Sequence, residues 1–196
     1  MSRASHEDQA YLIRQASDSL GLTQTLAKAT RVLADHGIPS LLVGGIAVQE
    51  YGYARYTADV DLVVPDVQVA TQVLASDGFE EKPGLIAVLT DETGFEVHLH
   101  AGGAMRGPLP LPIPEIVSTA PQIASLSMLV SIKMSSYLRH PARHMQDAAD
   151  VIALIQANRL PREYPVEEAV RREYVDLWDK LDQDVEALKR WTASRQ

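Results

Sequence analysis

The sequence predicts an α+β fold, in which a small mixed β-sheet is flanked by helices and followed by further helices at the C-terminal end. Two observations lead to this prediction. Short apolar runs bounded by glycine or proline alternate irregularly with segments of helical periodicity, which argues against a doubly wound sheet. Hydrophobic residues make up 46% of the 196 residues and cysteine is absent, so a core must form without disulfides.

The first half of the chain alternates helices with two buried strands. Apolar residues recur at helical spacing before Gly37 and again between Pro65 and Gly78, and glycine and proline commonly end such segments. Two short apolar runs between these segments have the length of strands, and the first ends at Gly44-Gly45. We expect helices over residues 6–36, 46–54 and 67–75, and strands over residues 40–43 and 60–64.

The second half begins with a hairpin and ends with helices. Asp91 to Gly94 has the composition of a turn, whereas four prolines within residues 101–114 exclude a helix and disfavour a strand. The domain boundary is placed after this loop, with a core and its N-terminal helices over residues 1–115 and a C-terminal helical region packed on that core over residues 116–196. We expect strands over residues 85–89 and 95–99, and helices over residues 125–138, 141–157 and 166–191.

Charge and motifs exclude several classes of function. The net charge is −8, which is unfavourable for nonspecific nucleic-acid binding because contacts to phosphate dominate that affinity. The sequence contains no serine-hydrolase elbow, no zinc-protease motif and no P-loop. No apolar run is long enough to span a bilayer, and the first fifteen residues lack the apolar stretch of a signal peptide. We therefore expect a cytoplasmic protein with no membrane partner.

One segment combines features that need a chemical reason. Gly44-Gly45 stands at a predicted strand-to-helix turn, where glycine lets the backbone approach a ligand and the helix N-terminus offers N–H groups to an anion. Asp59-x-Asp61 begins the next strand, and residues two apart on a strand share a face. Two neighbouring carboxylates repel each other, and a hard cation such as Mg²⁺ between them relieves that repulsion. The segment therefore predicts a cation site next to a glycine turn.

Arg55 and Thr57 precede the two aspartates at regular spacing, so the segment reads Gly44-Gly45, a predicted helix, and Arg55-x-Thr57-x-Asp59-x-Asp61. This pattern resembles the nucleotidyltransferase superfamily with the polymerase-β-type fold, in particular its small stand-alone bacterial members, which include toxin–antitoxin nucleotidyltransferases. Farther along, the segments containing Lys133 and Asp147 resemble two later helices of the family.

The resemblance implies a role for each matched residue. Asp59 and Asp61 would bind Mg²⁺ or Mn²⁺, as in enzymes that clamp the entering and leaving oxygens between two metal ions. The phosphates of a nucleoside triphosphate (NTP) would be contacted by the following residues: Gly44, Gly45, Arg55, Thr57 and Lys133.

The third carboxylate of the family pattern is missing here. The family places an Asp on a later strand, and the matching position in this sequence is His98, with Glu96 two residues earlier on the same face. Three interpretations stay open. Glu96 serves as the third catalytic carboxylate and metal ligand through a shifted register; His98 binds a softer metal, since imidazole suits Zn²⁺ better than Mn²⁺; or the site is degenerate. Elsewhere, Asp147 and Asp150 are interpreted as helix-surface acids or partners of a nearby arginine such as Arg143.

Two function hypotheses follow. The first is a metal-dependent nucleotidyltransferase that moves a nucleoside monophosphate from an NTP to a hydroxyl of an RNA, a protein or a small molecule. The resemblance implies tRNA or a protein as acceptor and an antitoxin-type protein as partner. The second is a catalytically degenerate module of the same fold that binds a nucleotide or a partner protein in a regulatory role, and it is motivated by His98.

Overall fold

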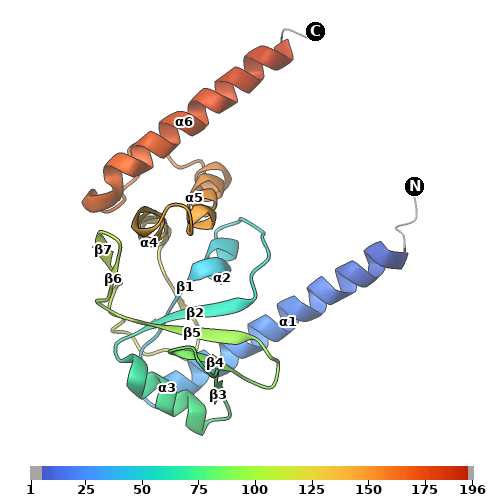
Figure 1. The fold of residues 1–196 in the computed structure, drawn as a ribbon, viewed down its shortest axis with the longest axis vertical. Coiled ribbons are helices and arrows are strands. Elements are labelled where there is room, and N and C mark those ends of the chain that lie inside the picture. Colours follow the sequence, from blue (N-terminus) through green and yellow to red (C-terminus); the bar gives the residue numbers. More distant parts are fainter. Residues whose placement is uncertain (1–5, 194–196) are drawn as a thin grey trace. The chain divides into compact units, whose positions relative to one another are not determined.

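The computed structural model describes residues 6–193 and confirms the α+β fold, with a mixed sheet, helices and further helices at the C-terminal end (Figure 1). Over the described residues, the main sheet has six strands in the order β3-β4-β5-β2-β1-β8, and a separate pair joins β6 and β7. The strands are β1 (Leu41–Val43), β2 (Asp59–Val64), β3 (Glu80–Glu81), β4 (Val88–Thr90), β5 (Glu96–Ala101), β6 (Met105–Arg106), β7 (Leu109–Pro110) and β8 (Gln122–Ile123).

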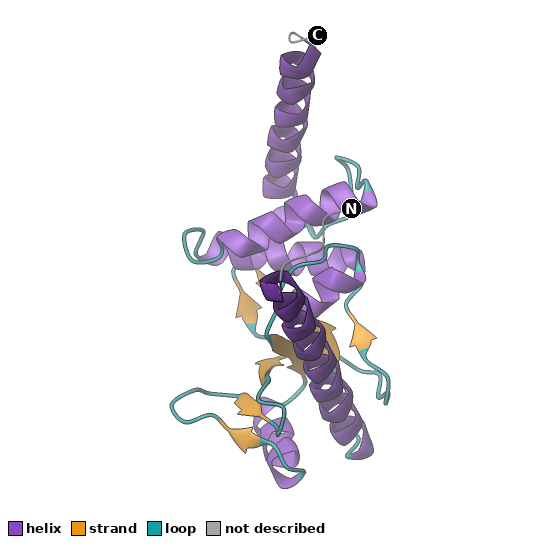
Figure 2. Cartoon of the chain, turned by 90° about the vertical axis from the view of Figure 1, so that its right-hand side faces the viewer, coloured by secondary structure: helices purple, strands orange, loops and turns teal. Residues whose placement is uncertain are grey.

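The helices follow the predicted order. They are α1 (His6–Asp35), α2 (Gly44–Glu50), α3 (Val67–Ser76), α4 (Leu126–Arg139), α5 (Met145–Asn158) and α6 (Glu168–Ala193), drawn in purple in Figure 2. Two of these helices begin with a side-chain cap. Asp66 accepts a hydrogen bond from the backbone N–H of Val69 at the start of α3, and Ser125 accepts one from Met128 at the start of α4.

The chain divides into two compact units. The first comprises the residues up to 46 together with 56–102 and 112–123, and it contains the main sheet, α1 and α3. The second comprises residues 47–55, 103–111 and those from 124 on, and it contains the β6–β7 hairpin and helices α4 to α6. The units interleave along the sequence, and the predicted domain boundary near residue 115 stays a prediction.

The core of the first unit is organised around β2. This strand pairs in parallel with β5 and antiparallel with β1. Val60 and Leu62 are fully buried on one face of β2, whereas Asp59 and Asp61 alternate with them and point to the other face. Helices α1 and α3 contact each other and β5. Burial of one face of the sheet therefore fixes the register that brings both aspartates to the opposite face.

The second unit is a helical cluster. Helices α4, α5 and α6 contact one another, and their buried apolar residues include Leu129 and Leu154. Tyr174 is fully buried, and its hydroxyl donates to the carbonyl of Pro161 at 2.9 Å. The Trp178 indole N–H donates to the carbonyl of Leu160 at 3.0 Å, so both polar aromatic groups are satisfied.

The structure corrects three expectations about local structure. Residues 101–114 contain the short β6–β7 hairpin instead of an irregular loop. Pro110 is tolerated there because a two-stranded ribbon has outer edges that need no donor. The two-residue strands β3 and β8 were not expected. Helix α5 begins at Met145 instead of Pro141, because residues 141–143 form a separate turn in which His144 N–H donates to the His140 carbonyl.

Among the described residues, no helix is both long and apolar enough to cross a membrane.

Candidate metal centre

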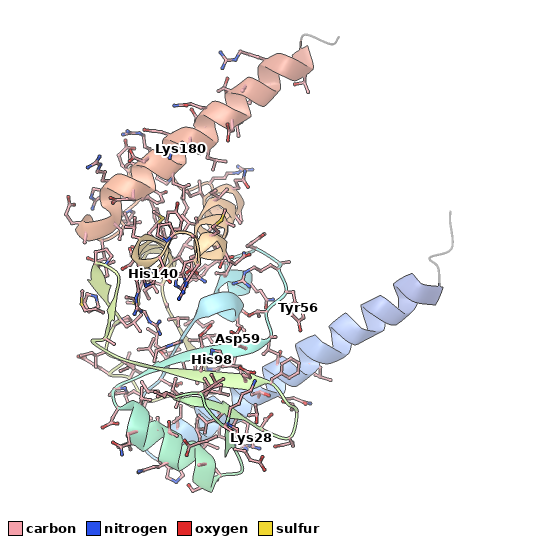
Figure 3. All side chains as sticks on the ribbon, viewed as in Figure 1. Lys28, Tyr56, Asp59, His98, His140 and Lys180 are labelled. Atoms are coloured by element: carbon pink, nitrogen blue, oxygen red, sulfur yellow. The ribbon has the colours of Figure 1, made fainter. Side chains whose placement is uncertain are left out.

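The two aspartates of the predicted motif lie on neighbouring positions of one sheet face. Asp59 and Asp61 are the first and third residues of β2, and their parallel partners on β5 are Glu96 and His98. Paired residues of adjacent strands point to the same face, so four chemically active side chains gather there. Figure 3 shows Asp59 and His98 on these two neighbouring strands.

Three of these side chains offer ligand atoms to one point. Atoms of Asp59, Asp61 and His98 all lie within 4.8 Å of one another, and each side chain is partly exposed. The Nδ1 atom of His98 lies 3.9 Å from Oδ2 of Asp59. Among the described residues, this is the one group of three or more acidic, histidine or cysteine side chains with this spacing.

Glu96 lies beside His98 and Lys82 and is not one of the three side chains at ligand spacing. Its carboxylate contacts the Lys82 ammonium, and its Oε2 lies 2.8 Å from Nε2 of His98. The hydrogen bond from Lys82, reinforced by the one from His98, lowers the pKa of the Glu96 carboxyl. Glu96 is therefore an ionised acceptor that holds His98.

Each aspartate has a neighbour that orients it. The Thr57 hydroxyl donates to Oδ1 of Asp59 at 2.8 Å. The Nε2 atom of His100 lies 2.8 Å from Oδ1 of Asp61, and because an ionised carboxylate can only accept, this nitrogen carries the proton. Such second contacts fix the direction in which a ligand side chain presents its atoms.

Gly44 leaves the space that Asp61 occupies. It is the first residue of α2 and has φ +70°, a conformation that costs residues with a Cβ. A Cβ built on Gly44 would lie 2.6 Å from Cγ of Asp61 and would overlap its carboxylate. The glycine predicted for close approach to a ligand is therefore required first by the aspartate beside it.

The donor set fits a divalent cation. Two carboxylates and one imidazole are hard and intermediate ligands, respectively, and both kinds bind divalent ions. The negative charge of Asp59 and Asp61 favours a cation at their shared face. The hydrogen bonds to Thr57 and His100 orient these carboxylates.

Two predicted nucleotide contacts belong to the second unit and meet on one carboxylate. Arg55 donates to Asp150 through Nε at 2.8 Å and Nη2 at 3.0 Å. The ammonium of Lys133 lies 2.9 Å from Asp150 and 2.7 Å from Asp147. The Gln146 amide also donates to Asp150, whose side chain is fully buried. Asp150 thus binds two positively charged side chains, Arg55 and Lys133, and the side-chain amide of Gln146.

The titration of this cluster follows its pairing. Burial disfavours the charged form of Lys133, but the charges of Asp147 and Asp150 outweigh it and raise the pKa of the Lys133 ammonium. Burial likewise opposes ionisation of Asp150, but Lys133 and the hydrogen bond from Arg55 lower the pKa of its carboxyl. Lys133 and Asp150 are therefore both charged at neutral pH.

The sequence interpretation gave no role to two residues of these clusters, Lys82 and Gln146. Of the two interpretations of Asp150, the surface acid is wrong, because its side chain is fully buried. It is instead the partner of an arginine, and that arginine is Arg55, not Arg143. His100 follows His98 by two residues, and this alternation placed it on the same strand face. Lys82 and Gln146 reach their partners from loop and helix positions that no sequence pattern indicates.

Comparisons with solved structures identify the fold of this chain, whereas sequence comparisons find no relative. No family model matches the chain, and no curated protein matches its sequence. An antigenic nucleotidyltransferase-like protein from Paracoccidioides brasiliensis is similar in structure, with a TM-score of 0.57 and 19% identity over 87% of this chain and 93% of that one.

Two structures of the antibiotic-resistance factor ANT(2'')-Ia are more distant. Its solution structure gives a TM-score of 0.47 at 11% identity, covering 86% of this chain and 97% of that one. Its crystal structure with adenylyl-2''-tobramycin gives 0.48 at 9% identity, covering 83% and 97%. The match to the Paracoccidioides brasiliensis protein shows that this chain has a nucleotidyltransferase-like fold.

Proposed function

We propose that the protein is a metal-dependent nucleotidyltransferase, which moves a nucleoside monophosphate from an NTP to an acceptor hydroxyl. One observation carries the proposal. Asp59 and Asp61 lie side by side with His98 at ligand spacing, in a chain that has a nucleotidyltransferase-like fold. Fold alone hosts many functions, and the site gives the proposal its chemistry.

The proposed reaction is an in-line displacement at the α-phosphorus. The acceptor oxygen forms a new P–O bond, the bond to the β-phosphate oxygen breaks, and pyrophosphate leaves with the electron pair. The hydroxyl proton passes to solvent. Negative charge gathers on the phosphate oxygens during this step, and a divalent ion held by Asp59 and Asp61 would neutralise that charge and lower the pKa of the attacking hydroxyl.

The chain's own residues would hold and direct the reacting groups. Asp59 and Asp61 provide the anionic ligands, and Thr57 and His100 fix their carboxylates. Gly44 provides backbone without a side chain next to Asp61, and Gly45 follows it at the start of α2, where the triphosphate is expected to approach. The phosphate contacts expected of Arg55 and Lys133 stay predictions, because both cations are bound to Asp150 within the second unit.

The finer parts of the hypothesis rest on the resemblance of the motif. It favours an RNA, protein or small-molecule acceptor, with tRNA as the first to test. It also favours a cognate antitoxin-type protein as partner. The predicted use of Mg²⁺ or Mn²⁺ rests on the same resemblance and on the two carboxylates.

The test is transfer of label from α-³²P-labelled NTPs to total tRNA, to the protein itself and to small hydroxyl acceptors, each with Mg²⁺, Mn²⁺ or Zn²⁺. Asp61→Asn removes a metal ligand, so we expect a loss of at least about a hundredfold, because metal stabilisation of the transition state amounts to several kcal/mol. Asp77→Asn is the matched control, since Asp77 is a half-exposed acid of the same unit paired with a histidine. Full activity of Asp61→Asn would overturn the proposal.

A second candidate is favoured by His98 at the position of the third carboxylate. A chain that binds NTPs through Asp59 and Asp61 but transfers no label to any acceptor would be a nucleotide-binding regulatory module. A pyrophosphate-release assay separates the two. Both candidates predict metal-dependent binding of an NTP by calorimetry, but only the enzyme releases pyrophosphate.

A further inference from the structure

His98, the third side chain of the candidate metal centre, forms a hydrogen bond with the Glu96 carboxylate. His98 Nε2 lies 2.8 Å from Glu96 Oε2, and an ionised carboxylate can only accept a hydrogen bond. Nε2 therefore carries the proton, and in the neutral ring the other nitrogen, Nδ1, has a lone pair. This fixes the tautomer of His98.

The Glu96 carboxylate that binds His98 has a second partner, the Lys82 ammonium. The Lys82 ammonium contacts Glu96, so the order of contacts runs from Lys82 to Glu96 to the imidazole. A histidine that binds a metal through one nitrogen commonly donates its other N–H to a carboxylate in this way. The arrangement lets Glu96 act on a metal ion through His98, without being a ligand.

The other ring nitrogen of His98, Nδ1, lies near Asp59. Nδ1 lies 3.9 Å from Asp59 Oδ2, which is too long for a hydrogen bond. Two bonds of about 2.1 Å to one ion place their ligand atoms up to about 4.2 Å apart, so this spacing suits a shared ion. Asp61 brings a third ligand atom into the same group.

We propose that this centre selects a borderline transition-metal ion of the Zn²⁺ class over Mg²⁺, through His98 Nδ1 as the third ligand beside Asp59 and Asp61. The inference rests on the proposed function and names the metal class of that same site. An all-oxygen set suits Mg²⁺, whereas an imidazole nitrogen shifts preference to Zn²⁺ and its neighbours in affinity. Glu96, held by Lys82, is the positioning residue for His98.

The chain offers a matched control for an imidazole beside a carboxylate. His36 Nε2 lies 3.9 Å from Asp77 Oδ2, the same separation as in the centre. Both side chains of this pair are 44% exposed, and among the described residues the pair belongs to no group of three ligand side chains. If spacing to one carboxylate sufficed, His36 would bind the metal as well as His98.

The first experiment measures binding of Zn²⁺, Mn²⁺ and Mg²⁺ alone to the full chain by calorimetry. We expect the wild type to bind Zn²⁺ at least about tenfold more tightly than Mg²⁺. His98→Ala should lose about tenfold or more in Zn²⁺ affinity, and His98→Asp should lose Zn²⁺ affinity while gaining affinity for Mg²⁺. His36→Ala should change neither. Equal affinities in wild type and His98→Ala would overturn the inference.

The second experiment locates the bound nitrogen. Long-range ¹H–¹⁵N spectra of histidine-labelled protein report which ring nitrogen of His98 is protonated and which one Zn²⁺ shifts. We expect Nε2–H before and after titration, and a Zn²⁺-dependent shift at Nδ1. Zn²⁺ that leaves both nitrogens of His98 unchanged, or shifts Nε2, would contradict the assignment.

Glu96 variants separate a positioning role from direct ligation. Glu96→Gln keeps an acceptor oxygen for His98 but is a poor ligand, so it should retain most of the Zn²⁺ affinity, whereas Glu96→Ala should lose about ten- to a hundredfold. Equal losses in both variants would make Glu96 itself the ligand and overturn the positioning role.

The double variant Asp59→Asn/Asp61→Asn distinguishes failure of this inference from failure of the proposed function. If it abolishes binding of every metal while His98→Ala changes nothing, the inference fails and the proposed function stands. If it leaves metal binding intact, both fail.

Discussion

The two units of this chain use pairs of carboxylates in opposite ways. In the first unit, Asp59 and Asp61 are partly exposed on one sheet face and contact a hydroxyl and imidazole rings. In the second unit, buried Asp150 and its neighbour Asp147 are bound to Lys133, and Asp150 also binds Arg55 in a bidentate pair. Acidic side chains paired with lysine or arginine stabilise the fold. Acids gathered beside an imidazole, with no lysine or arginine bound to them in the contacts described above, are suited to a cation that comes from solution.

The same contrast separates their energetic roles. A buried charge is tolerated only with its partner, so removing one member of the Asp150 cluster leaves uncompensated charge in the interior. A partly exposed carboxylate keeps much of its hydration, so its removal costs the fold little and costs the site its ligand. The predictions below test this difference, from the largest expected effect on stability to the smallest.

Asp150→Asn should give the largest loss of stability. The variant leaves the buried ammonium of Lys133 and the guanidinium of Arg55 without the carboxylate that both bind, and breaking such a buried pair costs about 3–5 kcal/mol. Urea unfolding followed by tryptophan fluorescence measures it, since Trp178 lies in the same unit. A loss below about 1 kcal/mol would mean that the cluster is not the structural element described here.

Gly44→Ala should come next. Its φ of +70° and the overlap with Asp61 both oppose a Cβ, and a strained residue of this kind costs about 1–3 kcal/mol. Gly37→Ala is the matched control, because Gly37 has the same φ of +70° but no atom within 4 Å of a built Cβ. Both variants should lose stability, but only Gly44→Ala should also lose metal affinity, because it displaces Asp61. Equal metal binding in the two variants would separate Gly44 from the centre.

Acid should remove part of the advantage that Asp150 confers. Its pKa is lowered in the folded chain from the ordinary value of 3.8, chiefly because Lys133 and Arg55 outweigh its burial. A group with a lowered folded pKa stabilises the fold at pH values above its unfolded pKa, and this contribution is lost as pH falls through the folded value. The difference in unfolding free energy between wild type and Asp150→Asn should therefore shrink below about pH 4. A difference that is constant from pH 7 to pH 3 would contradict the pairing.

The sequence was most informative where one periodic pattern decides the geometry. Alternation of Val60 and Leu62 with Asp59 and Asp61 placed both acids on one face of β2, and the structure has them there. The α+β fold followed from the same kind of pattern. The β6–β7 hairpin was missed because proline statistics describe interior strands, whereas Pro110 lies in a two-stranded ribbon.

The partners of the site residues were less accessible to sequence reasoning. Arg55 and Asp150 are far apart along the chain, and nothing local in either segment specifies the bidentate pair that joins them. The sequence singled out His98 because it stands where the resembled pattern has an acid, and the structure places it beside Asp59. Its tautomer depends on Glu96 and Lys82, and the contact between β5 and the loop before β4 exists only in three dimensions.

Asp59→Asn should have a small effect on the stability of the metal-free chain, within about 1 kcal/mol, because the carboxylate is 38% exposed and its removal relieves repulsion from Asp61. The contrast appears when Zn²⁺ is added. A ligand at a hundred times its dissociation constant stabilises the wild type by about 2.7 kcal/mol, and this gain should be absent in the variant. Thermal unfolding with and without Zn²⁺ measures both quantities. An equal Zn²⁺-dependent shift in the two proteins would place the ion elsewhere.

Arg162→Ala should have the smallest effect on stability. It separates the contribution of burial from that of the bidentate hydrogen-bond geometry. Arg162 binds Asp179 through Nε at 2.7 Å and Nη2 at 2.9 Å, the same bidentate arrangement that Arg55 makes with Asp150. The Arg162 and Asp179 side chains are exposed, so water solvates the charge that the substitution leaves behind, and the loss of stability should be roughly a tenth of that in Asp150→Asn. Asp179→Asn is the companion variant, measured by the same urea unfolding. If either surface variant matched Asp150→Asn, the bidentate geometry would account for the stability of the buried cluster, and its burial would not.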